Sequence, residues 1–254
     1  MTWTPARPAK VTVLLGEYIA TIDREIAKLL WRYADPKTQA EMYNCISLEP
    51  VPSCMESYMP DAESVLVATD GYRLVVTPAY AGVVQSAQVF SPSFLQELKA
   101  WTKKPKKEAP TEVRATRSEL EFPKWGLVIP PYRGDALVLT VDEYAASDLA
   151  TIRGSAKYMN KDIKDRVIFP SGDGPAYRKL GGPGPVNKEP LPGTRSVAGA
   201  DSSSLSTKFL GEIAQLWPGG FEIASGGSLR PCVVTPTYDD APVAYIVVMP
   251  QRED

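Results

Sequence analysis

The chain has 254 residues, of which 44% are hydrophobic and 23% are charged, a composition typical of a soluble globular protein with one or two domains. Its 24 prolines argue against a bundle of long helices and favour many strands and turns. No histidine is present, which excludes Ser-His-Asp and Cys-His nucleophiles and histidine metal ligands. The formal net charge of −2 excludes nucleic-acid binding through bulk positive charge and leaves that role only to local basic surfaces.

Cysteine usage and hydropathy set the expected compartment. The 3 cysteines, Cys45, Cys54 and Cys232, form no CxxC pair, so neither a disulfide framework nor a zinc site is expected. The first apolar run, residues 11–15, is too short for a secretion signal, and no stretch approaches the ~20 residues of a membrane span. We therefore expect a cytoplasmic protein with no membrane segment, no metal and no cofactor.

The first predicted helix begins near residues 17–20 and combines an apolar face with a basic one. Its apolar positions are Ile22, Ile26, Leu29 and Leu30. Arg24, Lys28 and Arg32 follow at i, i+4 and i+8, which indicates a basic stripe on the opposite side. Short apolar runs then predict strands at residues 44–48, 65–69, 73–77 and 88–90.

A diverged internal repeat organises the rest of the chain. Residues 91–98 and 206–213 both fit the pattern S-x-x-F-L-x-E-[LI], with an offset of 115. Each begins with a serine suited to cap a helix, and each predicted helix ends near a tryptophan, Trp101 or Trp217. A predicted hairpin and an apolar closing strand follow in each half, at 112–122 and 126–130 and at 222–234 and 245–250.

The two halves predict two domains of the same kind. Residues 143–146 open a helical pattern that corresponds loosely to residues 17–20. The second half has further predicted strands at 166–169 and 195–198, and a Gly/Pro-rich loop at 181–193. We expect an α+β protein whose domains comprise residues 1–134 and 135–254.

Basic residues recur on three predicted helices. Besides Arg24, Lys28 and Arg32, the helix in the middle of the chain has Lys99 and Lys103, and the first helix of the second half leads into Arg153, Lys157 and Lys161. Any single stripe fits a solvated helix face. Three stripes at corresponding positions favour a DNA-facing surface that follows phosphates without reading bases.

Two segments resemble one known family. The run Val67-Ala68-Thr69-Asp70-Gly71-Tyr72-Arg73-Leu74 resembles the A-T-D-G-H-R-L signature in the middle domain of the bacterial DNA polymerase III beta subunit, the sliding clamp. The ending Tyr245-Ile246-Val247-Val248-Met249-Pro250 resembles that family's Y-V-V-M-P terminus. The resemblance implies that this chain has the family's middle and last domains, with antiparallel sheets outside and two helices per domain lining a DNA-facing surface.

The same resemblance implies a peptide-binding site, because in that family the two segments form a hydrophobic cleft for partner peptides. Its expected residues are Thr69, Gly71, Tyr72, Arg73, Leu74, Val247, Val248, Met249 and Pro250. Leu74, Val247 and either Val248 or Met249 are expected to line an apolar trough, and Arg73 to bind a peptide carbonyl or carboxylate at its rim. Tyr72 replaces the family's usual histidine, which leaves the peptide preference open.

The implied function is that of a sliding clamp without catalysis: a processivity factor that encircles duplex DNA in the nucleoid and binds DNA polymerase and clamp loader through short linear peptides. Clamps of this family contain six domains, so two domains per chain predict a homotrimer. The alternative is a clamp-like protein that does not encircle DNA and acts as a peptide-binding regulator or decoy. A carboxylate-based enzyme using Asp239-Asp240 or residues 61–63 is a third, weaker hypothesis, because adjacent acids on turns are usually solvated.

Overall fold

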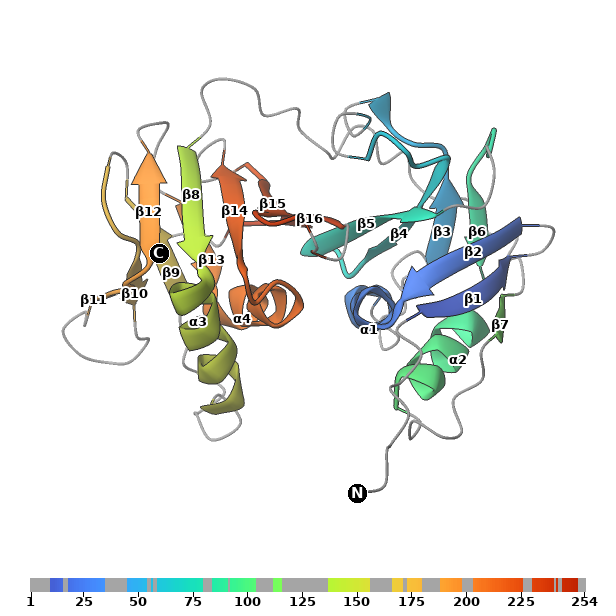
Figure 1. The fold of residues 1–254 in the computed structure, drawn as a ribbon, viewed down its shortest axis with the longest axis horizontal. Coiled ribbons are helices and arrows are strands. Elements are labelled where there is room, and N and C mark those ends of the chain that lie inside the picture. The colour runs from blue at the N-terminus through green and yellow to red at the C-terminus, as the bar shows by residue number, and fades with distance from the viewer. Residues whose placement is uncertain are drawn as a thin grey trace. The chain divides into compact units, whose positions relative to one another are not determined.

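The computed structural model describes residues 10–15, 18–34, 45–53, 56, 59–79, 84–90, 92–103, 112–115, 137–155, 166–170, 173–179, 188–197, 203–225, 230–239, 241 and 244–250. The chain divides into two compact units (Figure 1). Unit 1 comprises Met1–Val128 with Val243–Tyr245, and unit 2 comprises Ile129–Pro242 with Ile246–Asp254.

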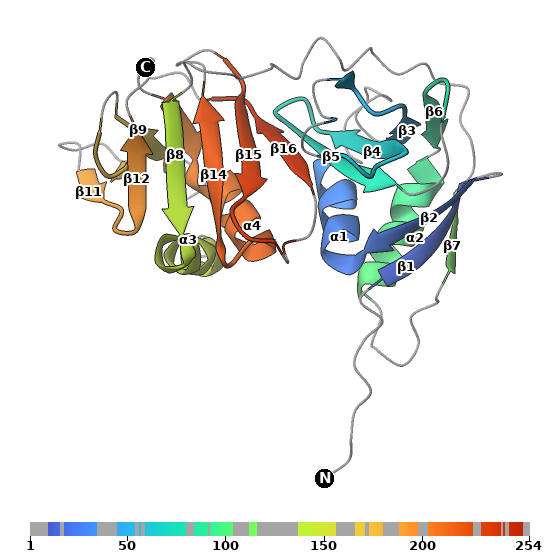
Figure 2. The same ribbon diagram turned by 45° about the horizontal axis from the view of Figure 1, so that its top comes forward.

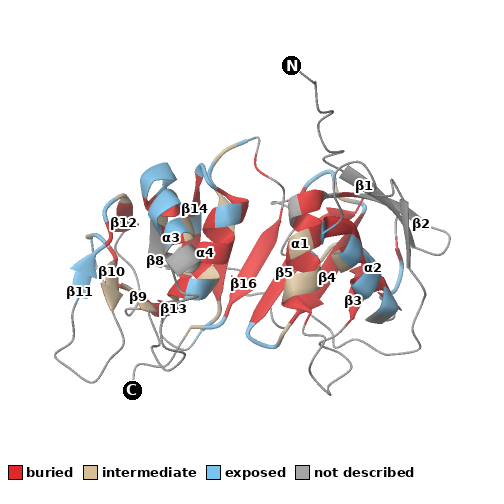
Figure 3. Ribbon diagram, turned by 90° about the horizontal axis from the view of Figure 1, so that it is seen from below, coloured by how far each residue is buried: buried red, intermediate tan, exposed pale blue. Residues whose placement is uncertain are grey.

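Unit 1 contains two groups of paired strands. Strand β1 (Lys10–Leu15) pairs antiparallel with β2 (Tyr18–Asp23) and parallel with β7 (Glu112–Ala115). The second group is antiparallel, in the order β6–β3–β4–β5, with bounds Gln88–Phe90, Ile46–Glu49, Ser64–Thr69 and Arg73–Ala79. Strands β3, β4 and β5 are buried along their whole length (Figure 3).

Two helices pack against each other in unit 1. Helix α1 (Arg24–Tyr33) contacts β4 and β5, and helix α2 (Pro92–Lys103) contacts β3 and β7. The rings of Phe90 and Phe94 meet edge to face at 5.8 Å, which joins the start of α2 to the end of β6. Trp101, near the other end of α2, is 1% exposed, so α2 is anchored in the core at both ends.

Unit 2 repeats this plan. One sheet runs β12–β8–β14–β15–β16 (Figure 2), with bounds Thr194–Val197, Leu137–Asp142, Gly220–Ser225, Cys232–Pro236 and Tyr245–Val248. A second group runs β11–β10–β9–β13, with bounds Lys188–Pro190, Tyr177–Lys179, Arg166–Phe169 and Ser203–Ser206.

The helices of unit 2 also form a pair. Helix α3 (Glu143–Ser155) contacts β8 and β14, while α4 (Thr207–Leu216) contacts β13 and α3. Asp142 caps α3, because its Oδ1 accepts a hydrogen bond of 2.9 Å from the backbone N–H of Ala145. Trp217 follows α4, is fully buried, and packs against Phe221 at 6.5 Å between ring centroids.

The expected α+β class is confirmed, and so are the helices that begin near residues 91, 143 and 206 and the hairpin of β14 and β15. The prediction that the first helix begins near residue 17 is wrong. Residues Tyr18–Asp23 pair along their whole length with β1, so the helix begins only at Arg24.

Other expectations differ in detail from the structure. The expected loop at 181–193 contains the exposed strand β11, which pairs with β10. Ser206 occupies the N-cap of α4 without a capping side-chain hydrogen bond, and the expected strand at 126–130 lies outside the described residues.

Candidate functional site

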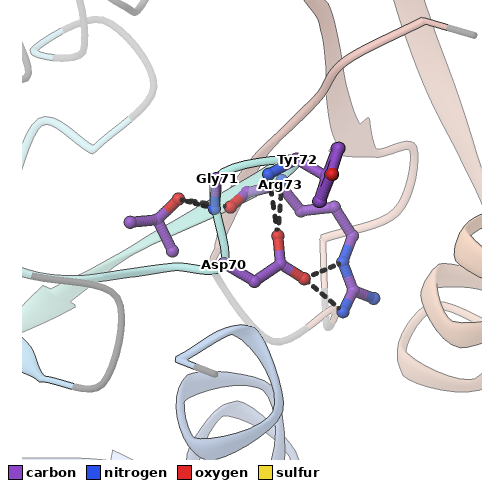
Figure 4. Close-up of polar contacts among 5 residues, drawn as sticks. Asp70, Gly71, Tyr72 and Arg73 are labelled. Atoms are coloured by element: carbon purple, nitrogen blue, oxygen red, sulfur yellow. Dashed lines mark hydrogen bonds and ion pairs between the residues drawn. The ribbon is translucent and has the colours of Figure 1, made fainter. Parts of the chain in front are cut away.

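The β4–β5 turn contains most of the expected peptide-binding segment, and a compact polar network holds it (Figure 4). Asp70 Oδ1 accepts hydrogen bonds from the backbone N–H groups of Tyr72 and Arg73, at 3.0 and 2.8 Å. Thr69 Oγ1 accepts the N–H of Gly71 at 3.1 Å and donates to the carbonyl of Arg73 at 2.7 Å. Gly71 has φ of 86°, a conformation that favours glycine. The turn is therefore pre-formed.

Arg73 points back into this turn, which corrects its expected role at the rim. Its Nε and Nη2 atoms donate to Asp70 Oδ2 at 2.9 and 2.7 Å, and its guanidinium lies 4.3 Å from the ring centre of Tyr33 on α1. Only 7% of Arg73 is exposed. Because its guanidinium is already bound by a carboxylate and packed on an aromatic ring, Arg73 stabilises the turn and is not available to bind a peptide carboxylate.

The remaining residues of the turn differ in how far they are exposed to solvent. Tyr72 is 69% exposed at the tip, whereas Leu74 is buried. Tyr72 is therefore the large side chain of this turn that is exposed to solvent. The sequence resemblance includes Tyr72 in the expected cleft and does not indicate that Tyr72 is exposed while Leu74 is buried.

The C-terminal segment lies in unit 2, on β16. Val247 and Val248 pair with Val233 and Cys232 of β15 and are buried. Met249 directly follows the strand and is 39% exposed, while Pro250 is half-buried. Met249 is therefore a flexible apolar side chain at the surface of unit 2. The turn and Met249 belong to different units.

Arg24 is not on the expected DNA-facing surface. The side chain is 6% exposed, its Nη2 donates to the carbonyl oxygen of Thr102, and its guanidinium lies 5.3 Å from the ring centre of Trp101. The reason is helical geometry: two steps of four residues rotate the position by about 80°, so Arg24 and Arg32 do not share one narrow face. Arg24 therefore connects the start of α1 to the end of α2 and stabilises their packing.

The other residues of unit 1 that were expected to face DNA are accessible. Lys28, Arg32 and Lys99 are half-buried and Lys103 is exposed. Arg32, Lys99 and Lys103 surround one ring, that of Trp31, at 5.5, 5.3 and 5.9 Å from its centre. Sequence reasoning missed Trp31, although its position directly before Arg32 in a basic helix was a usable signal.

Unit 2 does not show the same basic surface in its described residues. Arg153 lies on α3 without a described side chain, and Lys157 and Lys161 lie outside the described residues. Glu143 and Asp148 are exposed on α3, and Lys208 is exposed on α4. The described surface of this helix pair is thus mixed rather than basic.

The described acidic residues of the enzyme hypothesis lie at the surface. Asp61, Glu63 and Asp239 are exposed, and Asp240 lies outside the described residues. Among the described residues, no group of three or more cysteine or acidic side chains is placed to hold a metal. Burial raises the pKa of the Cys232 thiol, against the opposing effect of its hydrogen bonds to Ser225 and Ser203, so it is a poor nucleophile at neutral pH.

No helix in the described part of the chain is long and apolar enough to cross a membrane.

Comparison with known proteins identifies the fold. No protein-family model and no curated relative matches the chain. Solved structures of bacterial clamps do match. The DNA polymerase sliding clamp of Caulobacter crescentus is 16% identical with a TM-score of 0.64, covering 100% of this chain and 68% of that one. A sliding clamp of Pseudomonas aeruginosa with a ligand is 13% identical with a TM-score of 0.63, covering 95% of this chain and 76% of that one.

A third structure agrees: the DNA polymerase III subunit beta of Borrelia burgdorferi, in complex with a natural product, is 11% identical with a TM-score of 0.64, covering 90% of this chain and 61% of that one. The chain therefore has the sliding-clamp fold and spans roughly two thirds of these proteins' length. The resemblance in the two short motifs is confirmed at the level of fold.

Proposed function

We propose that the chain is a DNA sliding clamp, a processivity factor that encircles duplex DNA and has no catalytic activity of its own. The observation that carries the proposal is the basic surface on α1 and α2 in a chain with the sliding-clamp fold. Lys28, Arg32, Lys99 and Lys103 all reach solvent there. Cationic side chains on rigid helices bind phosphates without reading base sequence, as a protein that moves along DNA requires.

The ring would be a homotrimer. Two units per chain supply six units in three copies, and head-to-tail contacts close into a ring when the rotation between copies suits. The units would correspond to the middle and last domains of the clamp family. In this proposal the protein acts in the cytoplasm, at the nucleoid.

Partner proteins would bind through short peptides at a cleft formed by the β4–β5 turn and the end of β16. Tyr72 and Met249 are the exposed apolar side chains of these two segments. A DNA polymerase and a clamp loader are the proposed partners. Short motifs with one or two apolar anchors suit such a surface.

Two measurements test the ring. Light scattering should give a mass about three times 27.7 kDa. Protein loaded on a nicked circular plasmid should stay bound in high salt, because a ring around DNA does not depend on ionic contacts that salt screens. It should be lost when the plasmid is linearised, because a ring can slide off a free DNA end. A stable monomer at micromolar concentration, or equal retention on circular and linear DNA, contradicts the ring.

The peptide site has its own test. A labelled peptide with Gln and Leu/Phe anchors should bind with micromolar affinity, and Met249→Asp should abolish binding. Tyr144→Asp is the matched control, because Tyr144 is also exposed in unit 2 (68%) but lies on α3. Unchanged binding after Met249→Asp, or an equal loss with the control, contradicts the site.

The second candidate is a peptide-binding regulator or decoy that does not encircle DNA. The exposed carboxylates of Glu143 and Asp148 on α3 favour it, since a ring lined by that helix would place negative charge near phosphates. This candidate predicts a monomer that binds the peptide and shows no retention on circular DNA.

A further inference from the structure

Three cations from two helices gather around one indole ring in unit 1. Trp31 and Arg32 lie on α1, and Lys99 and Lys103 lie on α2. The Arg32 guanidinium and the two lysine Nζ atoms are within 5.9 Å of the Trp31 ring centre. We call these four residues the Trp31 cluster. Its indole is half-buried and Lys103 is exposed, so the cluster reaches the surface.

Hydrogen bonds hold the indole in one orientation. Trp31 Nε1 donates to Thr102 Oγ1 at 2.9 Å, and that hydroxyl donates to the carbonyl of Lys99 at 2.9 Å. The polar edge of the indole is therefore already satisfied. What remains to interact with a ligand is the aromatic surface, in a fixed position on a helix.

Among the described residues, no carboxylate neutralises the charges of the cluster. In the part of the chain that the structure describes, neither Arg32, Lys99 nor Lys103 forms an ion pair with a carboxylate. Like charges so close together repel, and the ring offsets this only through weak cation–π attraction. An anionic ligand would relieve the repulsion, and the phosphodiester backbone offers such charge at regular spacing.

We propose that the Trp31 cluster binds single-stranded DNA, with an unpaired base stacked on Trp31 and the neighbouring phosphates bound by Lys99, Lys103 and Arg32. A fixed aromatic ring among cations is the combination that suits unpaired nucleotides. A base can displace a flexible lysine from the ring, because stacking on an indole is stronger than an exposed cation–π contact. The freed ammonium then stays close enough to reach the adjacent phosphate.

This inference extends the proposed function, since paired bases in a duplex cannot stack on a protein side chain. It predicts that the protein binds the unpaired strand at a primer–template junction as well as the duplex. The binding requires only unit 1 and no ring.

The test compares Trp31→Leu with Trp31→Phe. Both variants lose the indole N–H and keep an apolar side chain, but only phenylalanine keeps an aromatic face. The probe is a fluorescent oligothymidylate, with a duplex of equal length measured beside it at the same salt concentration. We expect Trp31→Leu to weaken oligothymidylate binding about 5- to 150-fold, the loss of one stacked base. Trp31→Phe should weaken it several-fold less, and both should leave duplex affinity within about twofold.

Two further variants complete the design. The double variant Lys99→Gln/Lys103→Gln should weaken both probes and lower the salt dependence of binding, because it removes phosphate contacts. Tyr144→Leu, at the exposed aromatic of α3, should change neither.

The proposal is overturned if the full chain does not bind oligothymidylate at low salt, if the Trp31→Leu and Trp31→Phe variants behave alike, or if Trp31→Leu lowers the single-strand and duplex affinities by the same factor. None of these results depends on ring closure, which retention on circular DNA measures separately.

Discussion

The helix pairs of the two units share a buried framework and differ in surface charge. Helices α1 and α2 carry 5 basic and 2 acidic residues, whereas α3 and α4 carry 2 basic and 3 acidic. Yet the second helix of each pair ends beside a fully buried tryptophan, Trp101 or Trp217. Packing constrains the interior of a repeat and leaves its surface free to diverge, so the two helix pairs are distinguished by their charge and not by their fold.

The neighbours of the two tryptophans sharpen this contrast. Trp101 packs against the guanidinium of Arg24, and Trp217 packs against the ring of Phe221. Unit 1 thus combines buried cations with aromatic rings, a pattern that Arg73 and Tyr33 repeat. A buried tryptophan near the end of the second helix thus makes a polar contact in one unit and an apolar contact in the other.

The largest expected effect tests the shared framework. Trp101→Ala and Trp217→Ala should each lower the free energy of unfolding by about 3–5 kcal/mol, because each leaves a large cavity in its core. Urea titration of each variant measures the loss, and Trp→Phe at the same position is the milder control. A cost below about 1 kcal/mol at either position would break the correspondence between the two units.

Asp70→Ala tests the buried charges of unit 1. The variant leaves the guanidinium of Arg73, 7% exposed, without its carboxylate, and should cost about 3 kcal/mol. Asp70→Asn keeps an acceptor for the backbone N–H groups of the turn and should cost less. Urea titration of both variants separates the two contributions: equal costs would show that the acceptor for the backbone N–H groups contributes little, and a negligible cost in both would show that the ion pair contributes little.

The two arginines at either end of α1 test whether charge in unit 1 has two separate roles. Arg24→Ala should lower stability by about 1–3 kcal/mol, since the buried carbonyl of Thr102 loses its donor. Arg32→Ala should change the free energy of unfolding by less than about 0.5 kcal/mol. It should also make the affinity for DNA less dependent on salt concentration, by the amount that corresponds to about one lost phosphate contact. If Arg24→Ala instead changes DNA binding in a protein of normal stability, Arg24 belongs to the DNA surface after all.

The smallest effect concerns the helix starts of unit 2. Asp142→Ala should cost about 1 kcal/mol, because its carboxylate caps α3. Ser206→Ala should cost almost nothing, since the Ser206 side chain makes no capping hydrogen bond at the start of α4. Thermal melts of the two variants check the difference, and a reversed order would contradict the described caps.

Much of the fold could be predicted because its signals are local. Alternating or continuous apolar runs marked β4, β5, β6 and β9 closely, and the repeated S-x-x-F-L-x-E pattern located α2 and α4. The sequence predicts a helix from residues 17–20, but a segment of four residues fits the periodicity of a strand as well as that of a helix. Pairing of Tyr18–Asp23 with β1 decided for a strand. Strand β11 carries no apolar pattern, being exposed along its length, and only its partner β10 defines it.

The candidate site was predictable as a set of residues and not as an arrangement. The motifs identified the turn at residues 69–74 and the apolar segment ending at Pro250, while the spacing of four identified the basic helices. Which side chains face outward depended on neighbours distant in sequence. Asp70 and Tyr33 turn Arg73 inward, and Thr102 and Trp101 bury Arg24.

By itself, the sequence determined the α+β class, the internal repeat, the positions of most helices and strands, and the resemblance to the sliding clamp, because these depend on periodicity and on short motifs. Only the tertiary structure decided which cationic side chains are buried and stabilise the fold, and which are exposed enough to contact a ligand. A guanidinium has the same charge in either place. Its role depends on whether packing buries it against a carbonyl or a carboxylate, as at Arg24 and Arg73, or leaves it half-buried at the surface, as at Arg32.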